Sequence, residues 1–136
     1  MVYLMFNGVC EEALNLYAKA YNTKIDNIMK YKDAPANPDF PISEEEMDKV
    51  INASMTINGL QVMASDTPDL VDGNKMYLSM MFDDVDKLNH AWNTLKDGAM
   101  DIYMEPTESF FAVAHGSLRD KYGINWMFTV EKQMNF

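Results

Sequence analysis

The sequence predicts an α+β fold made of two tandem βαβββ modules. Hydrophobic patterns typical of strand, helix, strand, strand and strand occur in that order in each half of the chain. The segments LQVMASD (60–66) and INWMFTVE (124–131) are also similar, since each follows a turn signal and has a methionine at its centre, Met63 and Met127. A duplicated module accounts for both observations.

Module one begins with a short apolar strand at residues 2–6. A helix is predicted over residues 10–21, because apolar side chains recur there on one helical face. These side chains belong to Ala13, Leu14, Tyr17, Ala20 and Tyr21. Residues 24–31 alternate in part as a strand. Residues 50–66 predict a hairpin, because an Asn-Gly dipeptide between two apolar runs favours a two-residue turn.

Module two repeats this order, starting with a strand at residues 76–82. Asp83 and Asp84 can cap the helix predicted over residues 85–96, and Gly98 ends it by adopting a positive φ. The apolar face of this helix consists of Val85, Leu88, Trp92 and Leu95. Three strand patterns follow, at residues 99–106, 110–120 and 124–131.

We assign residues 1–136 to one domain, with module one at about 1–70 and module two at about 75–131. The modules differ in one respect, a long proline-rich connection between Tyr31 and Lys49 that occurs only in module one. A capping-box pattern from Ser43 to Glu46 predicts at most one helical turn within this connection.

The composition excludes several classes of protein. The net charge of −10, with 11 basic residues scattered among 21 acidic ones, argues against a nucleic-acid partner. The first residues lack a basic leader, and no apolar run reaches the roughly 18 residues that cross a bilayer, so no membrane segment is expected. One cysteine, Cys10, permits no internal disulfide and fits a reducing compartment. We therefore expect a cytoplasmic protein.

Three stretches match a known sequence pattern: YLMFNGVCEEALNLYAKAY (3–21), residues 30–66, and FFAVAHGSLRDKYGINWMF (110–128). Together they resemble the PhnB-like branch of the vicinal oxygen chelate superfamily, which includes glyoxalase I, the bleomycin-resistance proteins and extradiol dioxygenases. Members share a YLxFxGxCEEALxFY opening, an LMASD-type strand end and a closing DxxGxxW. The chain departs from many relatives at Asn52, where they carry His.

The resemblance implies that each module curls its sheet into a half-open, glyoxalase-like cup. It also implies that metal ligands, in enzyme members, come from the first and last strands of each module. Those strands offer only Gln61 and Glu131 as ordinary ligand types, and such a pair is not a site for zinc, iron or magnesium. We therefore predict no metal site and no cofactor. The candidate cup-lining residues are Met5, Gln61, Met63, Met81, His115 and Met127.

The predicted function is metal-free binding or sequestering of a small, partly aromatic or apolar molecule by a homodimer. Ligand-binding members of the fold usually work as dimers, and pairing protects the exposed edges of small open sheets. The alternative is a metal-dependent lyase, isomerase or dioxygenase with its metal at another site. Methyl transfer from S-adenosylmethionine is not supported, because the six glycines are isolated and form no glycine-rich strand-to-helix turn.

We assign no catalytic residue. His115 fits either a general base or an ordinary hydrogen-bonded or exposed histidine. Cys10, beside a helix start, fits either a reactive thiol or a packed small side chain.

Two further predictions concern the cup. The loop from Tyr31 to Lys49 is expected to cover its mouth, because connections above roughly 15 residues in a compact domain tend to be functional or mobile. In the last strand, alternation puts Trp126 and Phe128 on one face and Met127 on the other. We expect Trp126 to pack under the second helix and Met127 to point into the cavity.

Overall fold

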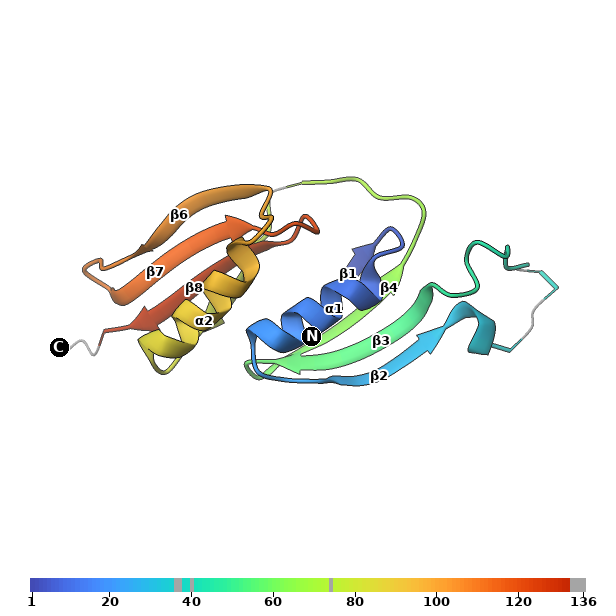
Figure 1. Cartoon of the computed structure of the whole chain (residues 1–136), viewed down its shortest axis with the longest axis horizontal. Helices are drawn as coiled ribbons and strands as arrows, with labels where there is room; N and C mark the ends of the chain where they lie inside the picture. The colour runs from blue at the N-terminus through green and yellow to red at the C-terminus, as the bar shows by residue number, and fades with distance from the viewer. Residues whose placement is uncertain (36–37, 40, 74, 133–136) are drawn as a thin grey trace. The chain divides into compact units, whose positions relative to one another are not determined.

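The computed structural model describes residues 1–35, 38–39, 41–73 and 75–132. It contains two four-stranded mixed sheets, each with one α-helix on one of its faces, in two successive βαβββ modules (Figure 1). The predicted α+β class and the duplicated module are therefore confirmed. The chain forms two compact units: Met1–Ala18 with Asn22–Val71, and Lys19–Tyr21 with Asp72–Phe136. The assignment of the whole chain to one domain stays a prediction.

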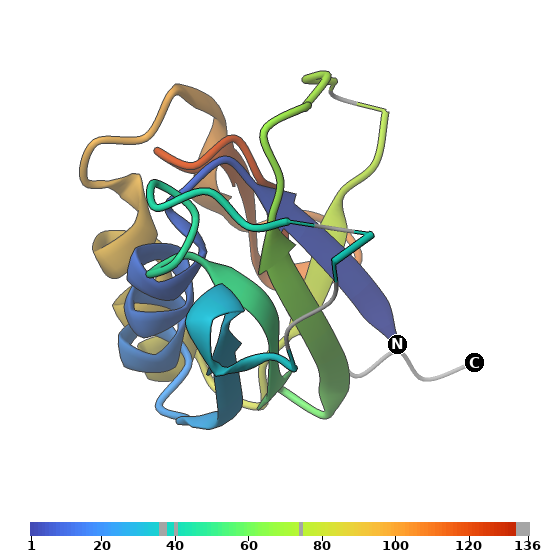
Figure 2. The same cartoon turned by 90° about the vertical axis from the view of Figure 1, so that its right-hand side faces the viewer.

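The first unit is built on a sheet with the strand order β1-β4-β3-β2. Its elements are β1 (Val2–Phe6), α1 (Cys10–Ala20), β2 (Ile25–Lys30), the 3-10 helix η1 (Tyr31–Asp33), β3 (Val50–Ile57) and β4 (Leu60–Asp66). β1 runs parallel to β4, and the other pairs are antiparallel. α1 lies on one face of the sheet (Figure 2), and its predicted apolar face is buried.

The second unit repeats this arrangement with the strand order β5-β8-β7-β6. Its elements are β5 (Leu78–Met81), α2 (Val85–Lys96), β6 (Asp101–Thr107), β7 (Ala112–Arg119) and β8 (Asn125–Glu131). β5 is parallel to β8, whereas β6 and β8 are both antiparallel to β7. Four side chains bury the inner face of α2: Leu88, Ala91, Trp92 and Leu95.

The two helices begin in different ways. Asp84 caps α2 as predicted, because its carboxylate accepts a hydrogen bond from the Lys87 backbone N–H at 2.7 Å. The first amide of α1, that of Cys10, instead donates to the Asp66 carboxylate at 3.0 Å. Asp66 stands at the end of β4, so the start of α1 is fixed by a residue 56 positions further along the chain.

The predicted Asn-Gly turn is present between β3 and β4. Asn58 and Gly59 both have positive φ, 47° and 83°, as the two-residue hairpin turn requires. The strand predicted to reach Tyr31 ends at Lys30, because Tyr31 opens η1. The Ser43–Glu46 pattern forms hydrogen-bonded turns without a helix, with Ser43 Oγ donating to Glu46 Oε1 at 3.2 Å.

The faces of β8 follow the predicted alternation. Trp126 and Phe128 are fully buried on the side that carries α2, and the ring of Trp92 meets that of Phe128 edge to face at 5.7 Å. Trp126 also donates a hydrogen bond from its indole Nε1 to Asp120 Oδ2 at 2.8 Å. Met127 lies on the opposite face and is partly exposed. We therefore retain the prediction that Trp126 mainly supports stability.

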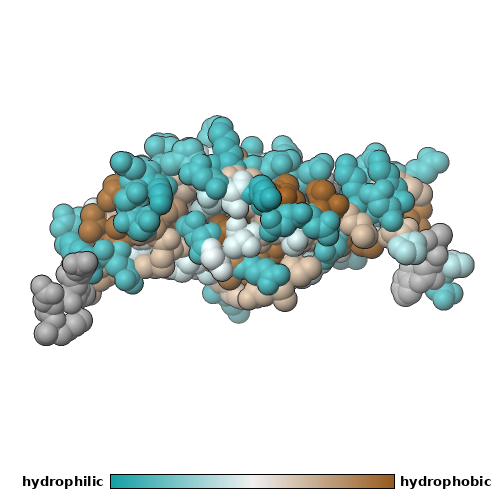
Figure 3. Space-filling view, turned by 90° about the horizontal axis from the view of Figure 1, so that it is seen from below, coloured by the Kyte–Doolittle hydropathy of each residue, from teal (hydrophilic) through white to brown (hydrophobic). Residues whose placement is uncertain are grey.

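Hydrophilic side chains cover most of the face drawn in Figure 3, with smaller hydrophobic areas between them. Within the residues that the structure describes, no helix is long and apolar enough to cross a membrane. The cytoplasmic location stays a prediction.

Candidate functional site

Each sheet has one face that carries a helix and one face that is open. Because paired residues on neighbouring strands share a face, the register assigns side chains to the open faces. In the first unit, the open face includes Tyr3, Met5, Gln61, Met63 and Ser65. In the second unit, it includes Ser79, Met81, His115, Met127 and Thr129.

All six predicted cup-lining residues lie on these open faces. Met5, Gln61 and Met63 belong to the first unit, and the second unit contains the others, which are Met81, His115 and Met127. Within the second unit, Met81 and His115 line one concavity. Whether any of the six binds a ligand stays a prediction.

This concavity has a volume of about 570 Å³ and lies over β5, β8 and β7. Its walls are formed by Ser79, Met81, Phe111, His115, Thr129, Glu131 and Lys132. His115 and Thr129 are paired across β7 and β8, and His115 Nδ1 is hydrogen-bonded to Thr129 Oγ1 at 2.9 Å. The Phe111 ring meets the imidazole edge to face at 5.3 Å. An aromatic and thioether wall therefore adjoins one oriented imidazole.

Two charged side chains, Glu131 and Lys132, also line the concavity. Lys132 Nζ lies 2.7 Å from Glu108 Oε1, and its hydrogen bond holds the pKa of Glu108 below the usual value. Glu131 adds a second carboxylate beside Lys132. A ligand in the concavity would therefore meet both signs of charge.

The donor set does not suit a metal ion. Among the described residues, no three His, Cys, Asp or Glu side chains come together as a metal site would require. In the concavity, the ordinary ligand types are His115 and Glu131, and its remaining oxygen groups are the hydroxyls of Ser79 and Thr129. The absence of a bound metal stays a prediction for experiment.

In the first unit, the polar contacts on the open face are longer than the His115–Thr129 hydrogen bond of the second unit. Asn52 donates from Nδ2 to the Tyr3 hydroxyl at 3.5 Å, and Ser65 donates to Met5 Sδ at 3.4 Å. The described part of the loop between Tyr31 and Lys49 lines a pocket at the ends of β1 and β4. The prediction that this loop covers a cup is untested, and its residues 36, 37 and 40 lie outside the described residues.

Sequence reasoning missed several residues of the concavity. Thr129 could have been found by continuing the alternation from Met127 by two residues. Ser79 could have been found from the duplication, since it corresponds to Tyr3. Phe111 could have been found by continuing the alternation back from His115 through the strand predicted at residues 110–120. Lys132 had no such signal, because it follows the end of β8.

Three solved structures have a similar fold. PA1353 from Pseudomonas aeruginosa is 23% identical with a TM-score of 0.84, and the match covers 98% of each chain. A putative 3-demethylubiquinone-9 3-methyltransferase, PhnB protein, from Bacillus cereus is 26% identical with a TM-score of 0.77, covering 96% of this chain and 97% of that one. A glyoxylase/bleomycin resistance/dioxygenase domain from Frankia sp. EAN1pec is 16% identical with a TM-score of 0.67, covering 98% and 91%.

Two open-faced βαβββ modules give this chain the fold of the glyoxylase/bleomycin resistance/dioxygenase domain. The chain belongs to the 3-demethylubiquinone-9 3-methyltransferase family, whose model matches residues 1–129. No curated protein matches the sequence closely enough to count as a relative. The predicted PhnB-like resemblance is thereby confirmed.

Proposed function

We propose that this protein binds a small, partly aromatic or apolar molecule without a metal ion, on the open face of its second module. The observation that supports the proposal is the concavity in which Met81 and Phe111 stand beside the His115–Thr129 hydrogen bond. Ligand pockets typically combine apolar surface with placed polar groups. This concavity has two apolar side chains, Met81 and Phe111, and its other lining residues are polar or charged.

Each part of the concavity has a distinct role in binding. Phe111 and Met81 are 38% and 45% exposed, so a ligand that covers them removes apolar surface from water. The hydrogen bond to Thr129 fixes the His115 ring, which leaves Nε2 to donate to or accept from the ligand. Thioether side chains adapt to ligands of different shape, so Met81 favours broad recognition of apolar groups.

Methyl transfer is not part of the proposal. The family description names a methyltransferase, but the two sheets are mixed, and among the described strands the parallel pairs are β1 with β4 and β5 with β8. A dinucleotide-type or S-adenosylmethionine site would need a glycine-rich turn from a strand into a helix.

We further propose that the protein acts as a homodimer, which light scattering in solution tests directly.

Dye binding to two matched variants tests the site. Met5 and Met81 hold equivalent positions in the two modules and are similarly exposed, at 42% and 45%. We expect Met81→Ala to weaken binding of anilinonaphthalene sulfonate severalfold, and Met5→Ala to leave it unchanged. Equal effects of the two substitutions would place binding elsewhere.

Elemental analysis of protein purified without chelators tests the metal-free part of the proposal. We expect no stoichiometric zinc, nickel, iron or manganese. A stoichiometric metal would favour the alternative, a metal-dependent lyase, isomerase or dioxygenase.

A further inference from the structure

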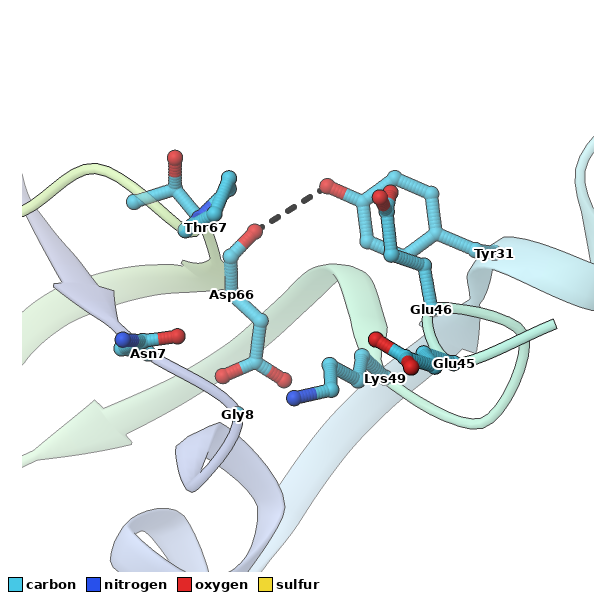
Figure 4. A pocket seen from close by; sticks show the side chains of 9 residues that line it. Asn7, Gly8, Tyr31, Glu45, Glu46, Lys49, Asp66 and Thr67 are labelled. Carbon is cyan, nitrogen blue, oxygen red and sulfur yellow. Dashed lines mark hydrogen bonds between the residues drawn. The ribbon is translucent and has the colours of Figure 1, made fainter. Parts of the chain in front are cut away.

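A second pocket lies in the first unit, away from the open face of its sheet. It has a volume of about 200 Å³ and is formed where the turn after β1, the end of β4 and the loop before β3 meet (Figure 4). Its walls are Asn7, Gly8, Tyr31, Glu45, Glu46, Lys49, Asp66, Thr67 and Pro68. The second module lacks the Tyr31–Lys49 connection, so this pocket has no counterpart built from a matching loop there.

Lys49 supplies the positive charge of this pocket. Its ammonium points into the pocket toward Asp66 (Figure 4), yet among the described residues it has no carboxylate oxygen within 4.0 Å. The two Asp66 carboxylate oxygens are hydrogen-bonded to the backbone amides of Cys10 and Val50, at 3.0 and 2.9 Å. The backbone amides hold the Asp66 carboxylate in place, and its negative charge faces the Lys49 ammonium, whose N–H groups can donate to a ligand (Figure 4).

Gly8 makes room for this ammonium. Gly8 has φ of +85°, and a Cβ at this position would lie 2.5 Å from Lys49 Nζ. A residue with a side chain would be strained by its backbone and would also displace the charge. The amide of Asn7 and the hydroxyl of Thr67 line the same pocket and supply further polar groups.

The pocket also has a negative charge away from Lys49. In Figure 4 the Glu46 carboxylate stands beside the Tyr31 ring, apart from the Lys49 ammonium. Burial raises the pKa of the Tyr31 hydroxyl, and the nearby Glu46 and Asp66 raise it further, so this hydroxyl stays protonated at neutral pH. Tyr31 donates to the Asp66 backbone carbonyl at 3.0 Å, which holds the ring in place. Glu45 adds a second carboxylate to the wall.

We propose that this pocket binds a small zwitterion of the amino-acid type, with its carboxylate on Lys49 and its ammonium near Glu46. The two charges of such a molecule match the separated charges of the pocket, whereas an ion of one sign is attracted by one group and repelled by the other. The volume lies below the roughly 300–1,000 Å³ of sites for drug-sized ligands, which limits the ligand to a few non-hydrogen atoms beyond its charged groups.

Three probes with the same carbon skeleton test the proposal on the unmodified protein. L-alanine carries both charges, propionate only the carboxylate and L-alaninamide only the ammonium. We expect L-alanine to shift the amide NMR signals of Asn7, Gly8 and Thr67 and to bind at least tenfold more tightly than either analogue. Comparable affinity for an analogue, or shifts confined to other residues, would overturn the proposal.

Two variants test whether the Lys49 ammonium is the group that binds L-alanine. Lys49→Met keeps most of the side-chain length and removes the ammonium, so L-alanine should bind at least tenfold more weakly. Lys87→Met is the matched control, because Lys87 lies on α2 and pairs with Asp83 outside this pocket. Unchanged affinity in Lys49→Met, or an equal loss in both variants, would overturn the proposal. Because the dye test concerns the second unit, failure of one site is distinguishable from failure of the other.

Discussion

Met63 and Met127 hold equivalent positions in the two modules. Met63 pairs with Tyr3 across β4 and β1, and Met127 pairs with Ser79 across β8 and β5. Tyr3 and Ser79 occupy matching positions in the repeated sequence pattern, and so do Met63 and Met127. Both methionines consequently lie on open faces, while their neighbours in sequence face a helix.

Trp126 and Met127 should differ sharply in their effect on stability. Trp126 is fully buried and hydrogen-bonded to Asp120, whereas Met127 is partly exposed on the open face. We expect Trp126→Ala to lower the free energy of unfolding by about 3–5 kcal/mol, as for other buried aromatic residues. Met127→Ala should cost much less. Urea unfolding of both variants measures this, and the reverse order would mean that the faces of β8 are exchanged.

Gly116 is predicted to be intolerant of a side chain. A Cβ there would lie 3.0 Å from both Met104 O and Pro106 N, which are backbone atoms of β6 and cannot move aside independently. We expect Gly116→Ala to destabilise the second unit by about 1–3 kcal/mol, the usual cost of overpacking. Gly73→Ala is the control, because a Cβ at Gly73 meets nothing within 4 Å. Equal thermal melting of the two variants would contradict this prediction.

Asp66 should contribute to stability through its two backbone partners. Its carboxylate accepts from the amides of Cys10 and Val50 and is 4% exposed. Hydrogen bonds to a charged group are worth about 1.5–3 kcal/mol, so Asp66→Ala should lower the free energy of unfolding by at least about 2 kcal/mol. Asp69→Ala, at an exposed position, is the control. A loss no larger than that of the control would show that the two amides find other partners.

Cys10 should make stability fall at alkaline pH. Burial, with smaller contributions from Asp66 and Glu11, raises the pKa of the thiol to about 12. The unfolded thiol loses its proton near its ordinary pKa of about 8.5, and the folded thiol does not. Between roughly pH 9 and pH 12 the folded state thus binds more protons, and stability decreases as pH rises.

Comparison with Cys10→Ala isolates this effect, since the other titrating groups are common to both proteins. The variant should show a flatter decline in unfolding free energy over the same alkaline range, even though it begins from a lower stability. Native Cys10 should also resist a thiol reagent at pH 8 and react fully in urea. Rapid labelling of the native protein at that pH would contradict the assignment of a buried, protonated thiol.

The sequence by itself determined the local elements and their order. The period of apolar residues defined α1, α2 and the strands, Asn58 and Gly59 defined a hairpin turn, and Asp84 identified a helix start. These features depend on residues a few positions apart, which is why the pattern suffices. The duplication added a prediction between distant residues, because matching positions of a repeated module lie on equivalent faces of the two sheets.

The tertiary structure alone decided which distant side chains meet. It brought Asp66 to the first amide of α1, His115 to Thr129 and Phe111, and Lys49 to the space above Gly8. These groups are 14 to 56 positions apart where hydrogen bonds join them. Strand pairing and loop placement create such contacts. A periodic pattern does not identify them, because registers that differ by two residues bury the same apolar face.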